Sequence, residues 1–197
     1  MAKATGPNYK VPFKRRRENK TNYYKRFAML KSGKPRLVIR ASNKNLYLQL
    51  IEFDKKGDRV IGSVCSKELE KFGWLPKANT PTAYLAGLLI TKKIPKNTQA
   101  ILDIGMATPT KGRILFAAAI GAKDGGLNIR IDPQIVPQER INGEHIAKYA
   151  QMLQQQNPEK FNRLFSDYIK HNFDITNLDK KFQEIKNKIL NGWVNEG

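Results

Sequence analysis

The first 34 residues carry more positive charge than a hydrophobic core could bury. They contain 11 lysines and arginines and one acid, Glu18, which gives a net charge of +10 out of +19 for the whole chain of 197 residues. Like charges at this density repel one another, and unpaired charged groups resist burial. We therefore predict that residues 1–34 form an extended basic arm, followed by a folded remainder.

Aromatic side chains are interleaved with these cations. They are Tyr9, Phe13, Tyr23, Tyr24 and Phe27. A polyphosphate can order such a segment through charge-assisted hydrogen bonds and the release of counterions. Aromatic rings can in turn stack on the bases of unpaired nucleic acid. The combination favours nucleic-acid binding, and a solvated basic tail or a targeting signal is the alternative interpretation.

The rest of the composition limits the class of protein. With 40% hydrophobic residues the chain can build a core, and a pI near 10.1 indicates a polyanionic partner. Cys65 is the single cysteine, so neither a disulfide framework nor a cysteine-based zinc site is expected. No apolar run has the length of a signal core or a membrane span, so we expect a cytoplasmic protein without a membrane partner.

Three β-strands are predicted directly after the arm. Runs of apolar, β-branched and aromatic residues at 36–40, 46–53 and 59–65 are separated by short polar turns, which is typical of antiparallel strands. A nearly all-apolar strand at 100–105 follows a helix predicted at 80–93. A crossover of this length implies that the fourth strand pairs in parallel.

Helices are predicted for most of the remaining chain. The first begins with Thr80 as its N-cap and Pro81 after it, and Gly87 allows another element to approach closely. The others cover residues 112–122, 139–156, 158–170 and 177–190, with a linker at 127–138. We expect their apolar stripes to pack on the core or on one another, with part of a stripe free for a partner. The predicted domains are the basic arm 1–34, a central α/β domain 35–130, and a linker with a helical C-terminal region 131–197.

The residues that catalysis would need are not clustered in the sequence. Each histidine, His145 and His171, stands alone, and neither belongs to a metal-binding spacing. Asp103 ends a central strand, where an α/β enzyme can place a catalytic acid. No second acid lies at a comparable strand end, and the neighbouring strand offers Arg36 and Arg40 instead. We therefore expect no enzyme activity, no metal, no cofactor and no small-molecule substrate.

Residues 105–112 have the layout of a phosphate-binding loop, because a strand is followed by a glycine- and lysine-containing loop and then a helix. A nucleotide-binding P-loop needs a glycine before its lysine and Ser or Thr after it. In this sequence Thr110 precedes Lys111 and Gly112 follows it. The helix start with Lys111 and Arg113 suits one backbone phosphate of a nucleic acid. A helix cap with exposed cations is the alternative.

The order of these motifs resembles a known family, the 5S ribosomal RNA-binding proteins of the large ribosomal subunit that carry number eighteen in the universal scheme, in their archaeal and eukaryotic form. The likeness is carried most clearly by YKVPFKRRRE at 9–18 and TNYYKRF at 21–27. Further matching segments are residues 32–38, 42–44, 57–59, 73–74, 79–81, 102–105, 109–112 and 143–147. They follow the family's order over about residues 8–150.

The resemblance implies a fold and a set of partners. The expected fold is a three-layer α/β domain related in layout to ribonuclease H, with three antiparallel strands and a fourth in parallel, without catalysis. The expected function is to dock 5S rRNA onto the large-subunit rRNA at the central protuberance of the ribosome, beside a second 5S-binding ribosomal protein.

Positions that match the family's motifs give the expected RNA contacts. In the arm they are Lys14, Arg15, Arg16, Arg17, Lys20, Tyr23, Tyr24 and Arg26. On the first hairpin they are Arg36, Arg40, Ser42, Asn43 and Lys44, and further along the chain Asn79, Thr80, Lys111 and Arg113. A helix cap explains Asn79 and Thr80 equally well.

Two other classes of protein share parts of this pattern. A chromatin-type protein would use similar charge to bind duplex DNA, and a nucleotide hydrolase would use the loop that contains Lys111. The aromatic residues of the arm favour a folded, partly single-stranded RNA over duplex DNA.

Overall fold

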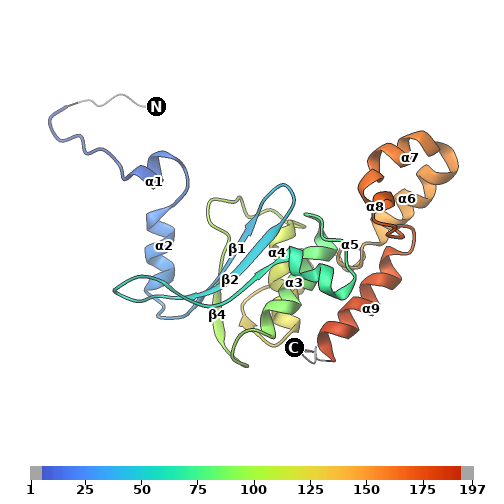
Figure 1. Cartoon of the computed structure of the whole chain (residues 1–197). Helices are drawn as coiled ribbons and strands as arrows, with labels where there is room; N and C mark the ends of the chain where they lie inside the picture. The colour runs from blue at the N-terminus through green and yellow to red at the C-terminus, as the bar shows by residue number, and fades with distance from the viewer. Residues whose placement is uncertain (1–5, 192–197) are drawn as a thin grey trace.

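The computed structural model describes residues 6–191, so the first five residues of the predicted arm and the last six of the predicted helical region lie outside it. Within these residues the chain builds a mixed sheet of five strands in the order β3-β2-β1-β4-β5 (Figure 1). The strands are β1 Arg36–Ala41, β2 Leu46–Glu52, β3 Arg59–Cys65, β4 Gln99–Asp103 and β5 Asn128–Ile129.

The pairing of the first four strands agrees with the prediction. β1 pairs with β2 and β2 with β3 in antiparallel fashion, and β4 lies parallel to β1. The predicted α/β class is thereby confirmed. β5 pairs in parallel with β4 and falls inside the predicted linker, because a strand of two residues is too short to produce a recognisable pattern.

Side-chain alternation separates the two faces of the sheet. Leu37 and Ile39 of β1 lie opposite Leu50 and Leu48 of β2, and all four side chains are fully buried. The intervening residues point to the other face, since successive side chains of a strand alternate. This second face carries Arg36 and Arg40, so the charged residues of β1 lie away from the core face.

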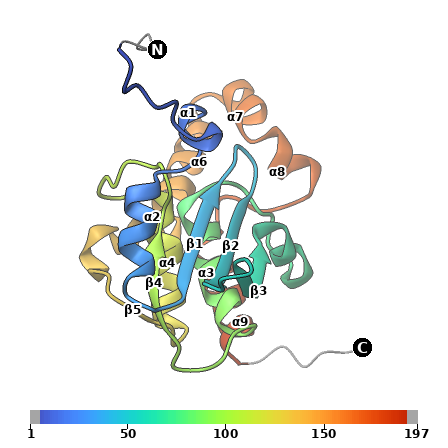
Figure 2. The ribbon, with the colours of Figure 1, turned by 90° about the vertical axis from the view of Figure 1, so that its left-hand side faces the viewer.

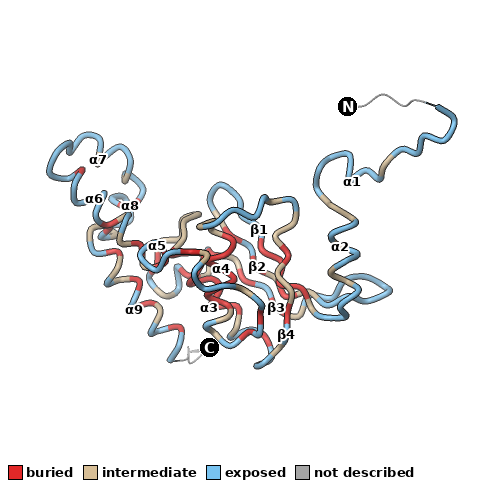
Figure 3. The backbone as a smooth tube through the Cα atoms, turned by 180° about the vertical axis from the view of Figure 1, so that it is seen from behind, coloured by how far each residue is buried: buried red, intermediate tan, exposed pale blue. Residues whose placement is uncertain are grey.

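Helices α3 Thr80–Thr91 and α4 Ile114–Asp124 cover the core face. They pack so closely that a Cβ on Gly87 would overlap the backbone of Ala118. The predicted close approach at Gly87 is therefore confirmed. Figure 3 shows that the buried residues concentrate in these helices and the sheet, whereas the arm is exposed for most of its length.

The start of α3 differs from the prediction by one residue. The N-cap is Asn79, whose side-chain oxygen accepts a hydrogen bond from the backbone N–H of Thr82, so the predicted N-cap at Thr80 is wrong. Both residue types cap helices well, and asparagine at the earlier position makes the bond here. A 3-10 helix, η1 Ser66–Phe72, ends shortly before this cap, and a second, η2 Pro133–Ile135, follows β5.

The predicted C-terminal helices are present but interrupted. They are α5 Gln138–Asn142, α6 Glu144–Gln156, α7 Pro158–Leu164, α8 Ser166–Lys170 and α9 Leu178–Leu190. Gly143 separates the first pair with a left-handed backbone, φ +82°, and Phe165 separates the second pair. The apolar periodicity continues across both breaks, which is why the sequence predicts single helices there.

Helix α9 completes the main core. Phe182 is fully buried, and its ring centroid lies 5.6 Å from that of Tyr84 and 6.4 Å from that of Trp74. The predicted packing of this apolar stripe on the core is confirmed. The helices α6 to α8 build a smaller cluster around Tyr168 and Ala150.

The arm is not extended throughout. Residues Lys14–Arg17 form the short helix α1 and Tyr23–Leu30 form α2 (Figure 2), so the prediction of an extended segment is wrong for these two stretches. Local interactions offset the charge repulsion: the Asn22 side chain caps α2 by accepting from the Lys25 N–H. None of the residues of α2 is buried, so the helix rests on the globule without joining its core.

Replacing Phe182 with alanine tests the role of α9. We expect the free energy of unfolding in urea to fall by about 3–5 kcal/mol, because a large buried side chain leaves a cavity. The control is Leu190→Ala at the end of the same helix, which is 41% exposed and should cost only about 0.5 kcal/mol. Equal small losses in both variants would show that α9 unfolds separately from the sheet.

Candidate nucleic-acid interface

A chain of ion pairs connects the arm to the sheet. Arg26 of α2 donates to Asp58 Oδ2 at 2.7 Å, and Arg36 of β1 donates to the same oxygen at 2.7 Å. Arg36 also donates to Asp103 Oδ2 at 2.9 Å, and Arg40 donates to Asp103 Oδ1 at 3.0 Å. Two acids thus hold three arginines, one from α2 and two from β1.

The strand register explains why these groups meet. β4 is parallel to β1 with Asp103 beside Val38, so Arg36 and Arg40, two residues to either side, share the face of that carboxylate. The Gly105 backbone N–H also donates to Asp103 Oδ1, at 2.8 Å. The carboxylate is therefore fully occupied by structural partners. This accounts for the isolated acid at the strand end without a catalytic role.

Arg36 is the buried member of the predicted set of RNA contacts. Arg36 is only 4% exposed and is held between the two acids, so its side chain cannot reach a phosphate while the network is intact. Arg36 lies on the outer face of β1, where α2 and the turn before β3 cover it. Arg40 keeps 46% of its side chain exposed and remains available.

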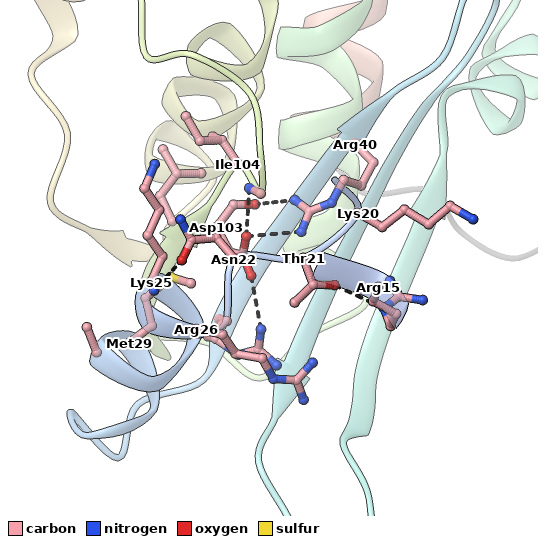
Figure 4. A pocket seen from close by; sticks show the side chains of 14 residues that line it. Arg15, Lys20, Thr21, Asn22, Lys25, Arg26, Met29, Arg40, Asp103 and Ile104 are labelled. Carbon is pink, nitrogen blue, oxygen red and sulfur yellow. Dashed lines mark hydrogen bonds and ion pairs between the residues drawn. The ribbon is translucent and has the colours of Figure 1, made fainter. Parts of the chain in front are cut away.

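A groove of about 430 Å³ lies between α2 and the ends of β1 and β4. Figure 4 shows Lys25 and Met29 on the α2 side, and Arg40 reaching Asp103 on the sheet side. Four cationic side chains of the predicted set line the groove, namely Arg15, Lys20, Arg26 and Arg40, together with the buried Arg36. The structure thus brings the arm and β1 together around one concave surface.

The remaining arm residues form an exposed cationic surface. Its predicted members Lys14, Arg15, Arg16, Arg17 and Lys20 are all exposed. The Arg16 guanidinium lies 5.2 Å from the ring centroid of Tyr24, which is 74% exposed, and such a cation–π pair leaves the outer ring face open for stacking. Tyr23 is half-buried against Phe13, with ring centroids 5.4 Å apart.

The turn of the first hairpin presents a second part of the interface. Ser42, Asn43 and Lys44 are exposed, and Ser42 closes the turn by exchanging hydrogen bonds with Asn45. Burial and the positive charge of Lys44 lower the pKa of Lys77, whose ammonium is paired with Asp167. Lys44 is therefore the cation that this turn offers to a phosphate.

Two of the predicted contacts, Asn79 and Thr80, belong to the start of α3. Asn79 uses its oxygen for the helix cap and its amide nitrogen for Tyr168 Oη, at 3.4 Å. Burial raises the pKa of Tyr168 to about 12, so the phenol stays protonated at neutral pH. The Asn79 side chain therefore has a structural role, and an RNA contact from it remains a prediction.

The loop before α4 begins at the groove. It runs from Gly105, which lines the groove, to Arg113, whose guanidinium donates to the Thr108 carbonyl at 2.7 Å. Lys111 is exposed, whereas the Gly112 N–H is taken by the Ile135 carbonyl and cannot receive a phosphate. The cations of this loop are accessible, but its backbone does not form a phosphate cradle.

Several interface residues were missed in the sequence analysis. Asp58 and Lys25 lie within segments that match the family's motifs, but neither was assigned a role, because their roles depend on contacts between distant segments. Tyr47 could have been found: it alternates outward between two buried leucines, lies opposite Arg40 and is 46% exposed. An exposed aromatic ring beside an arginine on an open sheet face is suited to base stacking.

Neither a metal site nor a membrane segment is found among the described residues. Over residues 6–191, no three His, Cys, Asp or Glu side chains are grouped so that they could hold a metal ion. In the same part of the chain, every helix is too short or too polar to cross a bilayer.

Comparison with known proteins identifies the class. A family model described as ribosomal large subunit proteins 60S L5 and 50S L18 matches residues 7–100. These residues run from within the arm, through the first hairpin, to the start of β4. The class that this model describes is that of large-subunit ribosomal proteins.

Curated relatives extend the match over almost the whole chain. Proteins named large ribosomal subunit protein uL18 are 47% identical in Staphylothermus marinus over 192 residues and 47% identical in Thermofilum pendens over 190 residues. These matches cover 95% and 94% of this chain, and 95% and 97% of the relatives. The Ignicoccus hospitalis protein of the same name is 46% identical over 191 residues, 95% of this chain and 94% of its own.

This chain belongs to the uL18 family of large ribosomal subunit proteins. The family resemblance inferred from the sequence motifs is confirmed. The relatives are named as constituents of a ribosomal subunit and not as enzymes, which confirms the expectation that this chain is not an enzyme.

Replacing Asp58 with asparagine tests whether the ion-pair chain holds α2. The variant removes the charge that Arg26 and Arg36 share, so we expect faster amide hydrogen exchange in α2 and a loss of about 1–3 kcal/mol in the free energy of unfolding.

The matched control is Asp54→Asn, four residues earlier in the same turn. Its carboxylate accepts only a local hydrogen bond from the Lys56 N–H among the described contacts, so α2 exchange should remain as in the parent. Equal α2 exchange in the parent and in Asp58→Asn would contradict the anchoring role.

Proposed function

We propose that this chain is a structural constituent of the large ribosomal subunit that binds 5S rRNA and docks it onto the large-subunit rRNA at the central protuberance. The observation that carries the proposal is the exposed cationic arm, which Asp58 joins to the sheet through Arg26 and Arg36. Membership of the uL18 family supports the assignment of this chain to the large ribosomal subunit.

The chemistry of the interface supports RNA as its ligand. The exposed arginines of α1 can each neutralise a phosphate, while the rings of Tyr24 and Tyr47 can stack on unpaired bases. If six to ten phosphates are contacted, the logarithm of the binding constant should fall with the logarithm of salt concentration with a slope of about −4 to −9. The family motifs favour 5S rRNA as the specific RNA.

The C-terminal helices support a protein partner in the same assembly. Residues 146–197 contain eight lysines and arginines against six acids, so this region lacks the excess charge of the arm. Tyr149, Met152, Leu164 and Ile169 are each at least 40% exposed. A surface with little net charge and with exposed apolar side chains suits protein contact better than phosphate contact. A neighbouring 5S-binding ribosomal protein would fit such a surface.

The strand order also supports the finer assignment of the fold. An order of β3-β2-β1-β4-β5, with three antiparallel strands followed by parallel ones, agrees with the proposed three-layer layout related to ribonuclease H. Asp103, the acid at the end of β4, is neutralised by two arginines, which fits a layout that serves as a scaffold. We retain the division into an arm 1–34, a central domain 35–130 and a helical region 131–197 as part of this proposal.

The triple variant Arg15→Ala/Arg16→Ala/Arg17→Ala tests the proposal. We expect its affinity for 5S rRNA to fall at least about tenfold and its salt slope to become shallower by about 2 to 3, because three phosphate contacts are lost. The thermal midpoint of the free protein should stay nearly unchanged, since exposed side chains contribute little to stability.

The matched control removes three exposed cations from the C-terminal helices, Lys160, Arg163 and Lys170, and should leave the salt slope close to that of the parent. A competition between 5S rRNA and duplex DNA at equal phosphate concentration separates this function from a chromatin-type one. Equal affinity for the two nucleic acids would contradict the proposal.

A further inference from the structure

A second concave surface lies on the sheet beside β5, where the arm ends. It has a volume of about 580 Å³. Six of the residues that line it come from three segments distant in the sequence: Ser32 and Lys34 from the end of the arm, Gln99 and Ile101 from β4, and Asn128 and Arg130 from β5 and its continuation. We call this surface the β5 groove. None of these six residues is among the RNA contacts predicted from the sequence.

The register of β4 and β5 places two carboxamide side chains next to each other. Gln99 pairs with Asn128, and the following pair is Ala100 with Ile129. Ala100 and Ile129 are buried in the core, and successive residues of a strand point to opposite faces. Gln99 and Asn128 therefore lie side by side on the outer face of the sheet, and both are exposed.

The β5 groove lies on the same face of the sheet as the ion-pair chain. Ile101 pairs with Arg36 in the register of β4 and β1, and Asp103 lies two residues further along the same strand. Both residues of β4 therefore point to the outer face, and Gln99 continues their row. The groove thus extends the cationic face of the sheet toward β5.

The polar side chains of the β5 groove have no partners within residues 6–191. Lys34, Gln99, Asn128 and Arg130 are exposed, and none of these side chains makes a hydrogen bond or an ion pair there. Neither Asp nor Glu is among the described residues that line the groove. Arg36 differs in this respect, because two acids compensate its charge. The two cations of the groove are therefore available to an external anion.

The combination of cations and carboxamides matches the chemistry of an RNA backbone. Lys and Arg bind phosphate oxygens, and Asn and Gln side chains can both donate and accept hydrogen bonds. A ribose 2′-OH is likewise a donor and an acceptor, and it lies close to the phosphates of the same strand. The carboxylates of an acidic protein could pair with the cations, but hydroxyl groups alternating with anions suit all four side chains. RNA is therefore the ligand that this groove fits best.

We propose that the β5 groove binds a second segment of 5S rRNA, separate from the segment held by α1. Phosphates lie against Lys34 and Arg130, and the carboxamides of Gln99 and Asn128 hydrogen-bond to ribose hydroxyls. The same face of the sheet carries the interface proposed for 5S rRNA, which favours this RNA as the source of the segment. The inference rests on the proposed function, because it adds a second site for the same RNA. Contacts at two places fix the orientation of an RNA on the protein.

The variant Lys34→Ala/Arg130→Ala tests the charge of the groove. We expect affinity for 5S rRNA to fall about fivefold or more and the salt slope to become shallower by about 1 to 2, because two phosphate contacts are lost. Hydroxyl-radical cleavage at saturating protein should show one short run of riboses that the parent protects and this variant exposes. The run exposed by the variant Arg15→Ala/Arg16→Ala/Arg17→Ala should stay protected.

The variant Gln99→Ala/Asn128→Ala tests the hydrogen bonds of the groove. It should expose the same riboses while keeping the salt slope of the parent, because it removes no charge. The substituted residues of both groove variants are exposed, so the thermal midpoint of each free protein should stay close to that of the parent.

The control Lys160→Ala/Arg163→Ala removes one lysine and one arginine from exposed positions of α7 and should behave like the parent. Parent-like affinity and protection in both groove variants, with binding still lost in the arginine triple variant, would overturn the groove and leave the proposed function standing. This is the result expected if the groove contacts an acidic protein. Protection by the groove of large-subunit rRNA instead of 5S rRNA would also contradict the assignment. Absence of 5S rRNA binding in the parent itself would overturn both the groove and the proposed function.

Discussion

The buried carboxylate of Asp103 is the group on which the cationic face of this protein depends. Arg36 lies two residues before Val38 and Arg40 two residues after it, on the same side of β1. Their like charges would repel each other without an acid between them. Removing one partner of a buried pair costs about 3–5 kcal/mol, since an uncompensated charge remains. In a chain of net charge +19, this acid fixes the positions of two cations, and Asp58 extends the same arrangement to α2.

This arrangement separates stability from binding. The apolar face of the sheet, covered by α3, α4 and α9, provides the core, so the opposite face and the arm are free to carry charge (Figures 1 and 3). The arm gains a defined starting direction because Arg26 ties α2 to the globule. Its outer part, including α1, keeps its cations exposed and can adapt its path to the shape of an RNA.

Local patterns in the sequence predicted most of the fold and part of the interface. Alternation located the first three strands, and the predicted neighbours of Asp103 are its partners in the structure. Alternation could not reveal that Arg36 is buried, because it assigns a face of the sheet but does not show that α2 and the Asp58 turn cover that face. β5 was missed because two residues have no periodicity, and Lys25 because the groove forms only when segments distant in sequence meet.

We propose that the arm, positioned by the ion-pair chain, supplies most of the affinity for RNA. The most direct test compares the full chain with a chain that begins at Lys34, by measuring the binding of 5S rRNA over a range of salt concentrations. We predict that the shortened protein keeps its fold by circular dichroism but binds much more weakly, with a shallower salt slope. Equal affinity and equal slope for the two proteins would contradict the account.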